Sequence, residues 1–137
     1  MIYVNFQEQS NAADWIESIQ LLAEDNSQPV WATPPVDLVV TMNVIPEGVC
    51  TSQDYSNSQS VTNAAVITAS ATPALSDGKL TIFDDGFIEI SIDDSLMLAL
   101  GPDQYGIAKR YLVFLKIQTE GFTIQFVVGV LPVIKGA

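Results

Sequence analysis

The sequence predicts an all-β fold, an antiparallel β-sandwich of about seven or eight strands with at most one short helix. The first observation is segment 111–134, where two runs rich in β-branched and aromatic residues flank a Thr-Glu-Gly connection at 119–121. A three-residue connection that ends in a left-handed glycine is typical of an antiparallel hairpin. The second observation is segment 80–92, where Asp-Asp-Gly at 84–86 separates two alternating apolar runs and indicates another hairpin.

The N-terminal region predicts two further strands. Residues 2–7 alternate apolar and polar side chains, which is the pattern of a half-buried strand. Segment 15–22 is ambiguous, because Trp15 and Ile19 share one face in a helix and also in a strand, whereas Glu17 interrupts the strand face. Periodicity alone slightly favours a helix here, and the preference for a strand comes from the family resemblance given below.

The middle of the chain predicts strands separated by turns and one long loop. Residues 38–45 form an apolar, β-branched run that predicts a strand, closed by Pro-Glu-Gly. Residues 51–63 are rich in serine, glutamine and asparagine and predict a long surface loop. Small residues at 64–71 predict a weaker strand, and 96–100 predicts one helical turn capped by Asp-Asp-Ser.

The strand after the 84–86 turn has a clear alternation of faces. Ile88, Ile90 and Ile92 are predicted to point toward the core. Phe87, Glu89 and Ser91 are then expected on the opposite face of the same strand.

Composition indicates one domain over residues 1–137. A chain of 137 residues can bury its own core, and no linker or repeat divides it. The chain is 48% hydrophobic and only 15% charged, yet no apolar run reaches the roughly 18 residues of a membrane span. The N-terminus lacks the basic and apolar regions of a secretory signal, so we expect synthesis in the cytosol and no membrane insertion.

Charge and residue types exclude several classes of function. The formal charge of −11 disfavours binding to nucleic acid or to anionic membranes. The chain has no histidine, which excludes a Ser-His-Asp triad, and its one cysteine, Cys50, excludes an intrachain disulfide. Turn geometry explains Asp84-Asp85 and helix capping explains Asp93-Asp94 better than calcium binding or acid–base catalysis does. We therefore predict no enzyme, no catalytic residue, no metal and no cofactor.

Candidate interface residues are aromatic, basic or exposed apolar side chains in loops. Lys109-Arg110 is the only adjacent basic pair, and either balances local acids in a solvated loop or forms part of a docking loop. Trp31, in a proline-rich segment, suits the core and an interface equally. The predicted interface residues are Trp31, Tyr55, Tyr105, Ile107, Lys109 and Arg110.

Several segments, read in order, resemble β-sandwich proteins of tailed-phage and prophage virions. The family comprises baseplate and upper-baseplate proteins and the N-terminal domains of receptor-binding proteins. The segments that carry the resemblance are Asp14-Trp15 with Ile19-Gln20-Leu21-Leu22, the turn 24–30, the strand 38–44, Gly78-Lys79-Leu80, 86–90, Leu100-Gly101-Pro102 leading to Tyr105, and the ending 129–133. The sequence departs from the family pattern at 51–63 and between Pro102 and Tyr111, which leaves the assembly partner open.

The resemblance implies a non-enzymatic virion part, an immunoglobulin-like sandwich that acts as an adaptor in the tail, baseplate or neck. It implies no catalytic residues and other virion proteins as partners. The high apolar fraction, the low charge density and the exposed edges of the hairpins suit burial against neighbouring chains, so we expect a homo-oligomer. The alternative within the virion is a capsid decoration or head-fibre base protein. From another class, a free-standing carbohydrate- or calcium-binding β-sandwich module remains an alternative.

Overall fold

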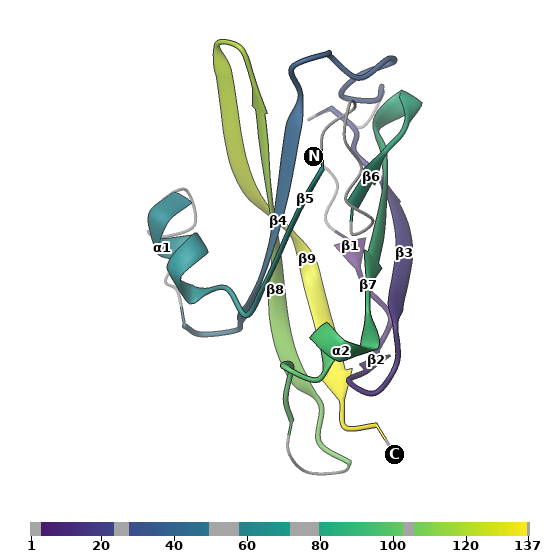
Figure 1. Ribbon diagram of the computed structural model, residues 1–137, viewed down its shortest axis with the longest axis vertical. Helices are drawn as coiled ribbons and strands as arrows, with labels where there is room; N and C mark the ends of the chain where they lie inside the picture. The colour runs from purple at the N-terminus through teal and green to yellow at the C-terminus, as the bar shows by residue number, and fades with distance from the viewer. Residues whose placement is uncertain (1–3, 24–27, 50–57, 72–79, 103–105, 137) are drawn as a thin grey trace.

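A computed structural model describes residues 4–23, 28–49, 58–71, 80–102 and 106–136. These residues form a six-stranded sheet and a three-stranded sheet that face each other (Figure 1). The all-β sandwich predicted from the sequence is confirmed. No helix in the described part of the chain is long and apolar enough to cross a membrane.

The larger sheet has the order β1-β9-β8-β4-β5, and β2 also pairs with β9. The smaller sheet has the order β3-β7-β6. The strands of the larger sheet are β1 (Val4–Asn5), β2 (Gln9–Ser10), β4 (Val39–Pro46), β5 (Ile67–Ala71), β8 (Lys109–Thr119) and β9 (Phe122–Ile134). Those of the smaller sheet are β3 (Trp15–Gln20), β6 (Leu80–Ile82) and β7 (Phe87–Ile92). The helical elements are α1 (Ser58–Ala64), α2 (Asp94–Met97) and the 3-10 turn η2 (Asp84–Gly86).

The β8–β9 hairpin is the longest pairing in the fold and confirms the prediction for 111–134. The two strands run antiparallel from Lys109↔Val133 to Thr119↔Phe122. Gly121 at the connection has a φ of +80°, the left-handed conformation that the sequence indicated. On its other side β8 pairs with β4, so this strand lies inside the larger sheet.

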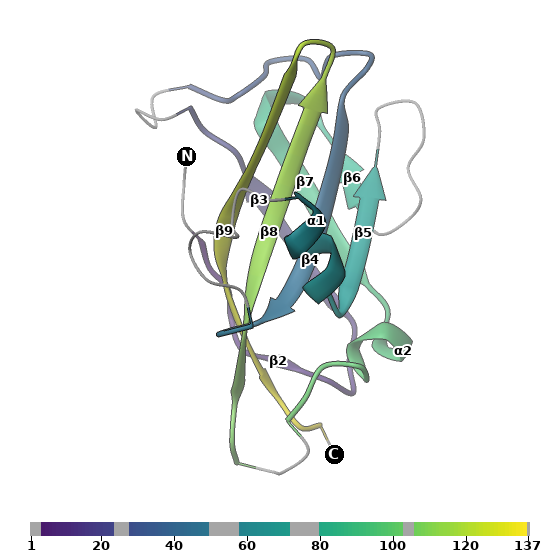
Figure 2. The same cartoon turned by 90° about the vertical axis from the view of Figure 1, so that its left-hand side faces the viewer.

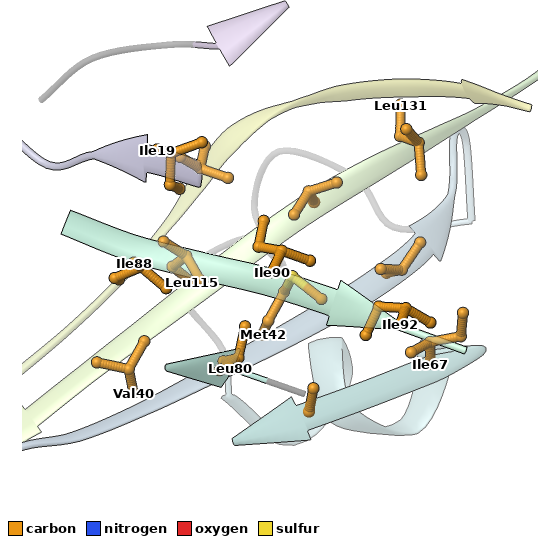
Figure 3. Packing of buried hydrophobic residues seen from close by; sticks show 14 of the residues in the cluster. Ile19, Val40, Met42, Ile67, Leu80, Ile88, Ile90, Ile92, Leu115 and Leu131 are labelled. Atoms are coloured by element: carbon orange, nitrogen blue, oxygen red, sulfur yellow. The ribbon is translucent and has the colours of Figure 1, made fainter. Parts of the chain in front are cut away.

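The core fills the space between the two sheets. Ile88, Ile90 and Ile92 of β7 are fully buried, as their alternation predicts, and they face Met42 and Leu115 of the larger sheet (Figure 3). Burial of each such side chain contributes about 1.5–3 kcal/mol.

The ambiguous segment at 15–22 forms a strand, β3, at the edge of the smaller sheet. Trp15 and Ile19 are buried, and Glu17 lies between them on the same face. The indole N–H of Trp15 donates a hydrogen bond of 3.0 Å to Oε1 of Glu17, which satisfies both polar groups. An inward-pointing acid on an edge strand opposes pairing with the edge of another sheet.

Two local predictions need correction. The segment 58–64, expected within a surface loop and a weak strand, forms the helix α1, so the described residues contain two short α-helices instead of one. The second helix begins at Asp94, earlier than predicted, and its Asp93 N-cap makes no side-chain hydrogen bond. Instead, the Asp94 N–H donates a hydrogen bond of 2.7 Å to Oδ1 of Asp14, a residue remote in sequence.

Helix α1 covers an apolar patch on the outward face of the larger sheet, away from the smaller sheet (Figures 1 and 2). Val61 of α1 packs there in a second buried cluster with Ile45, Leu112 and Phe114. A seven-residue helix that contains serine, threonine and valine has little stability of its own. Its stability therefore comes from this patch, which local periodicity in the sequence does not reveal.

We expect Val61→Ala to lower the free energy of unfolding by about 1–3 kcal/mol, because it leaves a cavity in the cluster under α1. The exposed Thr62→Ala on the same helix is the matched control and should change it by less than about 0.5 kcal/mol. Chemical denaturation measures both, and equal effects would contradict this packing of α1.

The η2 turn fixes the end of the smaller sheet. Asp85 and Gly86 both have positive φ, +60° and +76°, which matches the Asp-Gly hairpin predicted from the sequence. The Gly86 carbonyl accepts the Leu21 N–H at 2.8 Å, so this turn packs directly on the chain after β3. A Cβ at Gly86 would lie 2.5 Å from the Leu21 carbonyl oxygen.

Gly86→Ala should therefore cost at least about 2 kcal/mol of stability, since it combines backbone strain with a steric clash. Gly121→Ala has a similar φ of +80° but no atom within 4 Å of the added Cβ, so it isolates the strain and should cost about 1 kcal/mol. Thermal unfolding of the two variants separates these contributions. A Gly86 variant no less stable than the Gly121 variant would refute the close approach.

Candidate interaction surfaces

Three of the six predicted interface residues lie together at the start of β8. Ile107 is 54% exposed, and Lys109 and Arg110 are exposed at the first two positions of the strand. Tyr55 and Tyr105 lie outside the described residues. Trp31 is separate from this group.

Trp31 belongs to the core. Its side chain is 8% exposed, and its indole N–H donates a hydrogen bond of 2.8 Å to the Phe83 carbonyl. Of the two roles that the sequence left open for this residue, the structure gives it the core role.

The basic pair lies beside the turn that follows β4. Nη2 of Arg110 is 3.4 Å from Oε2 of Glu47, and the Glu47 N–H donates to the Arg110 carbonyl at 3.0 Å. Val49 in the same turn is 58% exposed. We call Val49, Ile107, Lys109 and Arg110 the basic end.

The ion pair leaves Arg110 accessible. The Arg110 side chain is 59% exposed and that of Glu47 is 43% exposed, so solvent screens their attraction. Nζ of Lys109 lies 5.4 Å from the centre of the Tyr111 ring, which holds this ammonium near the start of β8. Arg110 can therefore reach a partner, while Lys109 lies on the opposite side of β8.

Tyr111 anchors the start of β8 next to Lys109 and Arg110. The side chain is 1% exposed, and its hydroxyl accepts a 2.6 Å hydrogen bond from the Gly101 N–H. This bond ties the segment after α2 to β8 across ten residues of sequence. It therefore sets where the intervening loop begins.

A second candidate surface lies on the outward face of the smaller sheet. Ile16, Phe83 and Phe87 are 63%, 49% and 42% exposed. The Phe83 N–H donates to the Phe87 carbonyl at 2.9 Å, so the two phenylalanines are cross-strand neighbours. Glu89 lies two residues along β7 on the same face. We call Ile16, Phe83, Phe87 and Glu89 the aromatic face.

Sequence reasoning missed the aromatic face as a candidate interface. The alternation in β7 did place Phe87 and Glu89 away from the core. The sequence pattern did not show that Phe83 pairs with Phe87 and that Ser91 pairs with Ile16. These pairings bring side chains of β3, of β7 and of the segment after β6 onto one surface. An outward phenylalanine beside a turn was the available signal.

Charge is divided between the two surfaces. In the part of the chain that the structure describes, lysine and arginine occur only on β8 or just after β9, at Lys109, Arg110, Lys116 and Lys135. The charged residues of the smaller sheet and its η2 turn are Glu17, Asp84, Asp85 and Glu89, all acidic. The charged neighbours of the aromatic face on its own sheet are therefore acidic, whereas the basic end combines two cations with one acid, Glu47.

Comparisons with protein-family models, curated proteins and solved structures returned no match. Within the described ranges, no group of three or more cysteine, aspartate or glutamate side chains is arranged to hold a metal ion. The two exposed surfaces are thus the features from which a function can be argued.

Replacing Tyr111 by phenylalanine should lower the free energy of unfolding by about 1–3 kcal/mol, because the Gly101 N–H loses its acceptor in a largely buried position. Lys109→Gln, which removes only the contact of the ammonium with the Tyr111 ring, should cost less than about 1 kcal/mol. Urea unfolding followed by fluorescence provides the comparison. Equal stability of the Tyr111 variant and the unmodified chain would show that this hydrogen bond does not fix the loop.

Proposed function

We propose that this chain is a non-enzymatic structural adaptor of a phage virion, in the tail, baseplate or neck. In this role it joins neighbouring proteins by burying the aromatic face. The observation that carries the proposal is the difference between the outward faces of the two sheets.

On the larger sheet, helix α1 covers the apolar patch of the outward face. Val61 of α1 closes over Leu112 and Phe114, and all three side chains are buried. The smaller sheet has no such cover among the described helices and strands (Figure 1). Phe83 and Phe87 remain about half exposed there, and exposed apolar groups ringed by polar side chains mark interaction sites.

The surroundings of the phenylalanines have the composition of an interface. Ser18, Gln20, Thr81 and Ser91 surround them on the same face, by the register of the three strands. An apolar centre with a polar rim is the usual anatomy of a protein–protein contact. Aromatic side chains at such a centre contribute a large share of the binding energy.

We also infer that the sandwich is of the immunoglobulin type. The order β3-β7-β6 corresponds to strands B-E-D of that fold, and β9-β8-β4-β5 corresponds to G-F-C-C′. The Tyr111 hydroxyl, bonded to backbone upstream of β8, corresponds to the tyrosine corner at the start of strand F. Both features support the immunoglobulin-like fold that the family resemblance implied.

The virion assignment is supported by the family resemblance. In the pattern of those phage proteins, the segment that begins at Trp15 is a strand before a turn, and in this chain it is β3. The ending 129–133, which also carries the resemblance, lies within β9. The proposal of partners within a virion depends on these segments.

A direct test is to label purified phage or prophage particles, from a host that carries the gene, with a gold-conjugated antibody against this chain. The proposal expects gold at the tail, baseplate or neck. Label on the head would favour a capsid decoration or head-fibre base protein instead. Particles without label, from cells that make the chain, would contradict a virion role.

The double variant Phe83→Ser with Phe87→Ser should keep its fold but lose incorporation into particles by about tenfold or more, because the centre of the interface is removed. Leu98→Ser, which alters an exposed leucine (67%) on the surface next to α2, is the matched control. Quantitative mass spectrometry of purified particles measures both. Normal incorporation of the double variant would remove the aromatic face from the proposal.

A thermal-shift scan with calcium, chelator and a panel of glycans tests the other class of function. The adaptor proposal expects no shift of the melting temperature with any of them. A saturable shift with one glycan or with calcium would favour a binding module.

A further inference from the structure

We propose that the occupant of the aromatic face is the basic end of a second copy of this chain, so that copies associate head to tail. This inference deepens the proposed function, on which it rests, because it names the partner of the aromatic face. It depends on the charge and the apolar side chains of the two surfaces.

The aromatic face requires a basic partner. Glu89 lies within it, and the exposed Asp84 and Asp85 lie at its end next to Phe83 and Phe87. If two aromatic faces packed on each other, these acids would approach acids in the other copy, and like charges at an interface are strongly unfavourable. The formal charge of −11 adds to this repulsion. A symmetric contact through this face is therefore disfavoured.

The chain itself carries a surface of the opposite kind. At the basic end, the exposed apolar side chains of Val49 and Ile107 accompany the exposed cation Arg110, whereas Lys109 points to the opposite side of β8. The apolar side chains match the phenylalanines, and the Arg110 guanidinium matches Glu89, Asp84 and Asp85. Arginine and lysine also bind favourably over the faces of exposed aromatic rings such as Phe83 and Phe87.

The competing acid at the basic end is Glu47. Its contact with Arg110 is 3.4 Å, and both side chains are largely open to solvent, so it is a weak restraint. Arg110 can therefore exchange this contact for acids of a second copy while Glu47 returns to water.

The two surfaces cannot meet within one copy. The aromatic face lies on the outward side of the smaller sheet. The basic end lies in the larger sheet, where β8 begins and its partner β4 ends (Figure 1). A contact between two different surfaces leaves one of each free, so association continues until a ring closes or a filament grows. This geometry suits the repeated parts of a particle.

The test uses two variants that each lose one surface. The face variant carries Phe87→Ser and Glu89→Lys, and the end variant carries Ile107→Ser and Arg110→Glu. Light scattering across a wide concentration range should show assemblies larger than a dimer for the unmodified chain. Each variant alone should remain a monomer, with association weakened by about tenfold or more. An equimolar mixture should give a dimer with one copy of each variant, because one intact surface of each kind remains.

A charge-swapped chain that carries Glu89→Lys and Arg110→Glu together is the second measurement. Because both charges are reversed, it should assemble better than either single reversal. Leu98→Ser serves as the control outside both surfaces and should assemble like the unmodified chain. Melting curves for all variants confirm that the exposed substitutions preserve the fold.

Several results would overturn the inference. These are an unmodified chain that is strictly monomeric and an equimolar mixture of the two variants that stays monomeric. The third is an unmodified chain that forms a dimer which the end variant keeps and only the face variant loses. Such results leave the adaptor role intact if gold still labels the particles, because that role does not require the basic end as the occupant. Conversely, head-to-tail assembly without particle label would support the inference and overturn the virion role.

Discussion

Strand β8 determines how the two layers and helix α1 are arranged, because it is apolar on both faces. Four consecutive side chains, from Leu112 to Leu115, are buried. In a two-layer sandwich only alternate residues can reach the core, so Val113 and Leu115 pack against the smaller sheet while Leu112 and Phe114 point away from it. The second pair needs its own cover, and α1 supplies it through Val61.

Local patterns predicted the regular parts of the fold and failed where distant contacts decide the conformation. The β8–β9 hairpin and the 84–86 turn follow from residues adjacent in sequence. For α1 the apolar signal is only Val61 and the small Ala64 among polar residues, and the residues that stabilise the helix lie on β4 and β8. Glu17 gave a misleading signal at β3, because its partner is the Trp15 indole and its position is the edge of a sheet.

The candidate surfaces were predictable to a similar extent. Ile107, Lys109 and Arg110 are all exposed, but Lys109 and Arg110 belong to strand β8 and not to the loop expected from the sequence. Trp31 was open between two roles because its hydrogen-bond acceptor, the Phe83 carbonyl, is 52 residues away. The aromatic face combines three strand regions, so it exists only once the register of β3, β6 and β7 is known.

When copies of the chain associate, the aromatic face of one copy and the basic end of the next should be buried together. Hydrogen–deuterium exchange of dilute and concentrated samples tests it most directly, since amides in a new interface exchange more slowly. If the two surfaces meet, higher concentration should slow exchange in 80–92 and in 106–110 together and leave exchange in α1 unchanged. Slower exchange confined to α1 and the outward face of the larger sheet would contradict it.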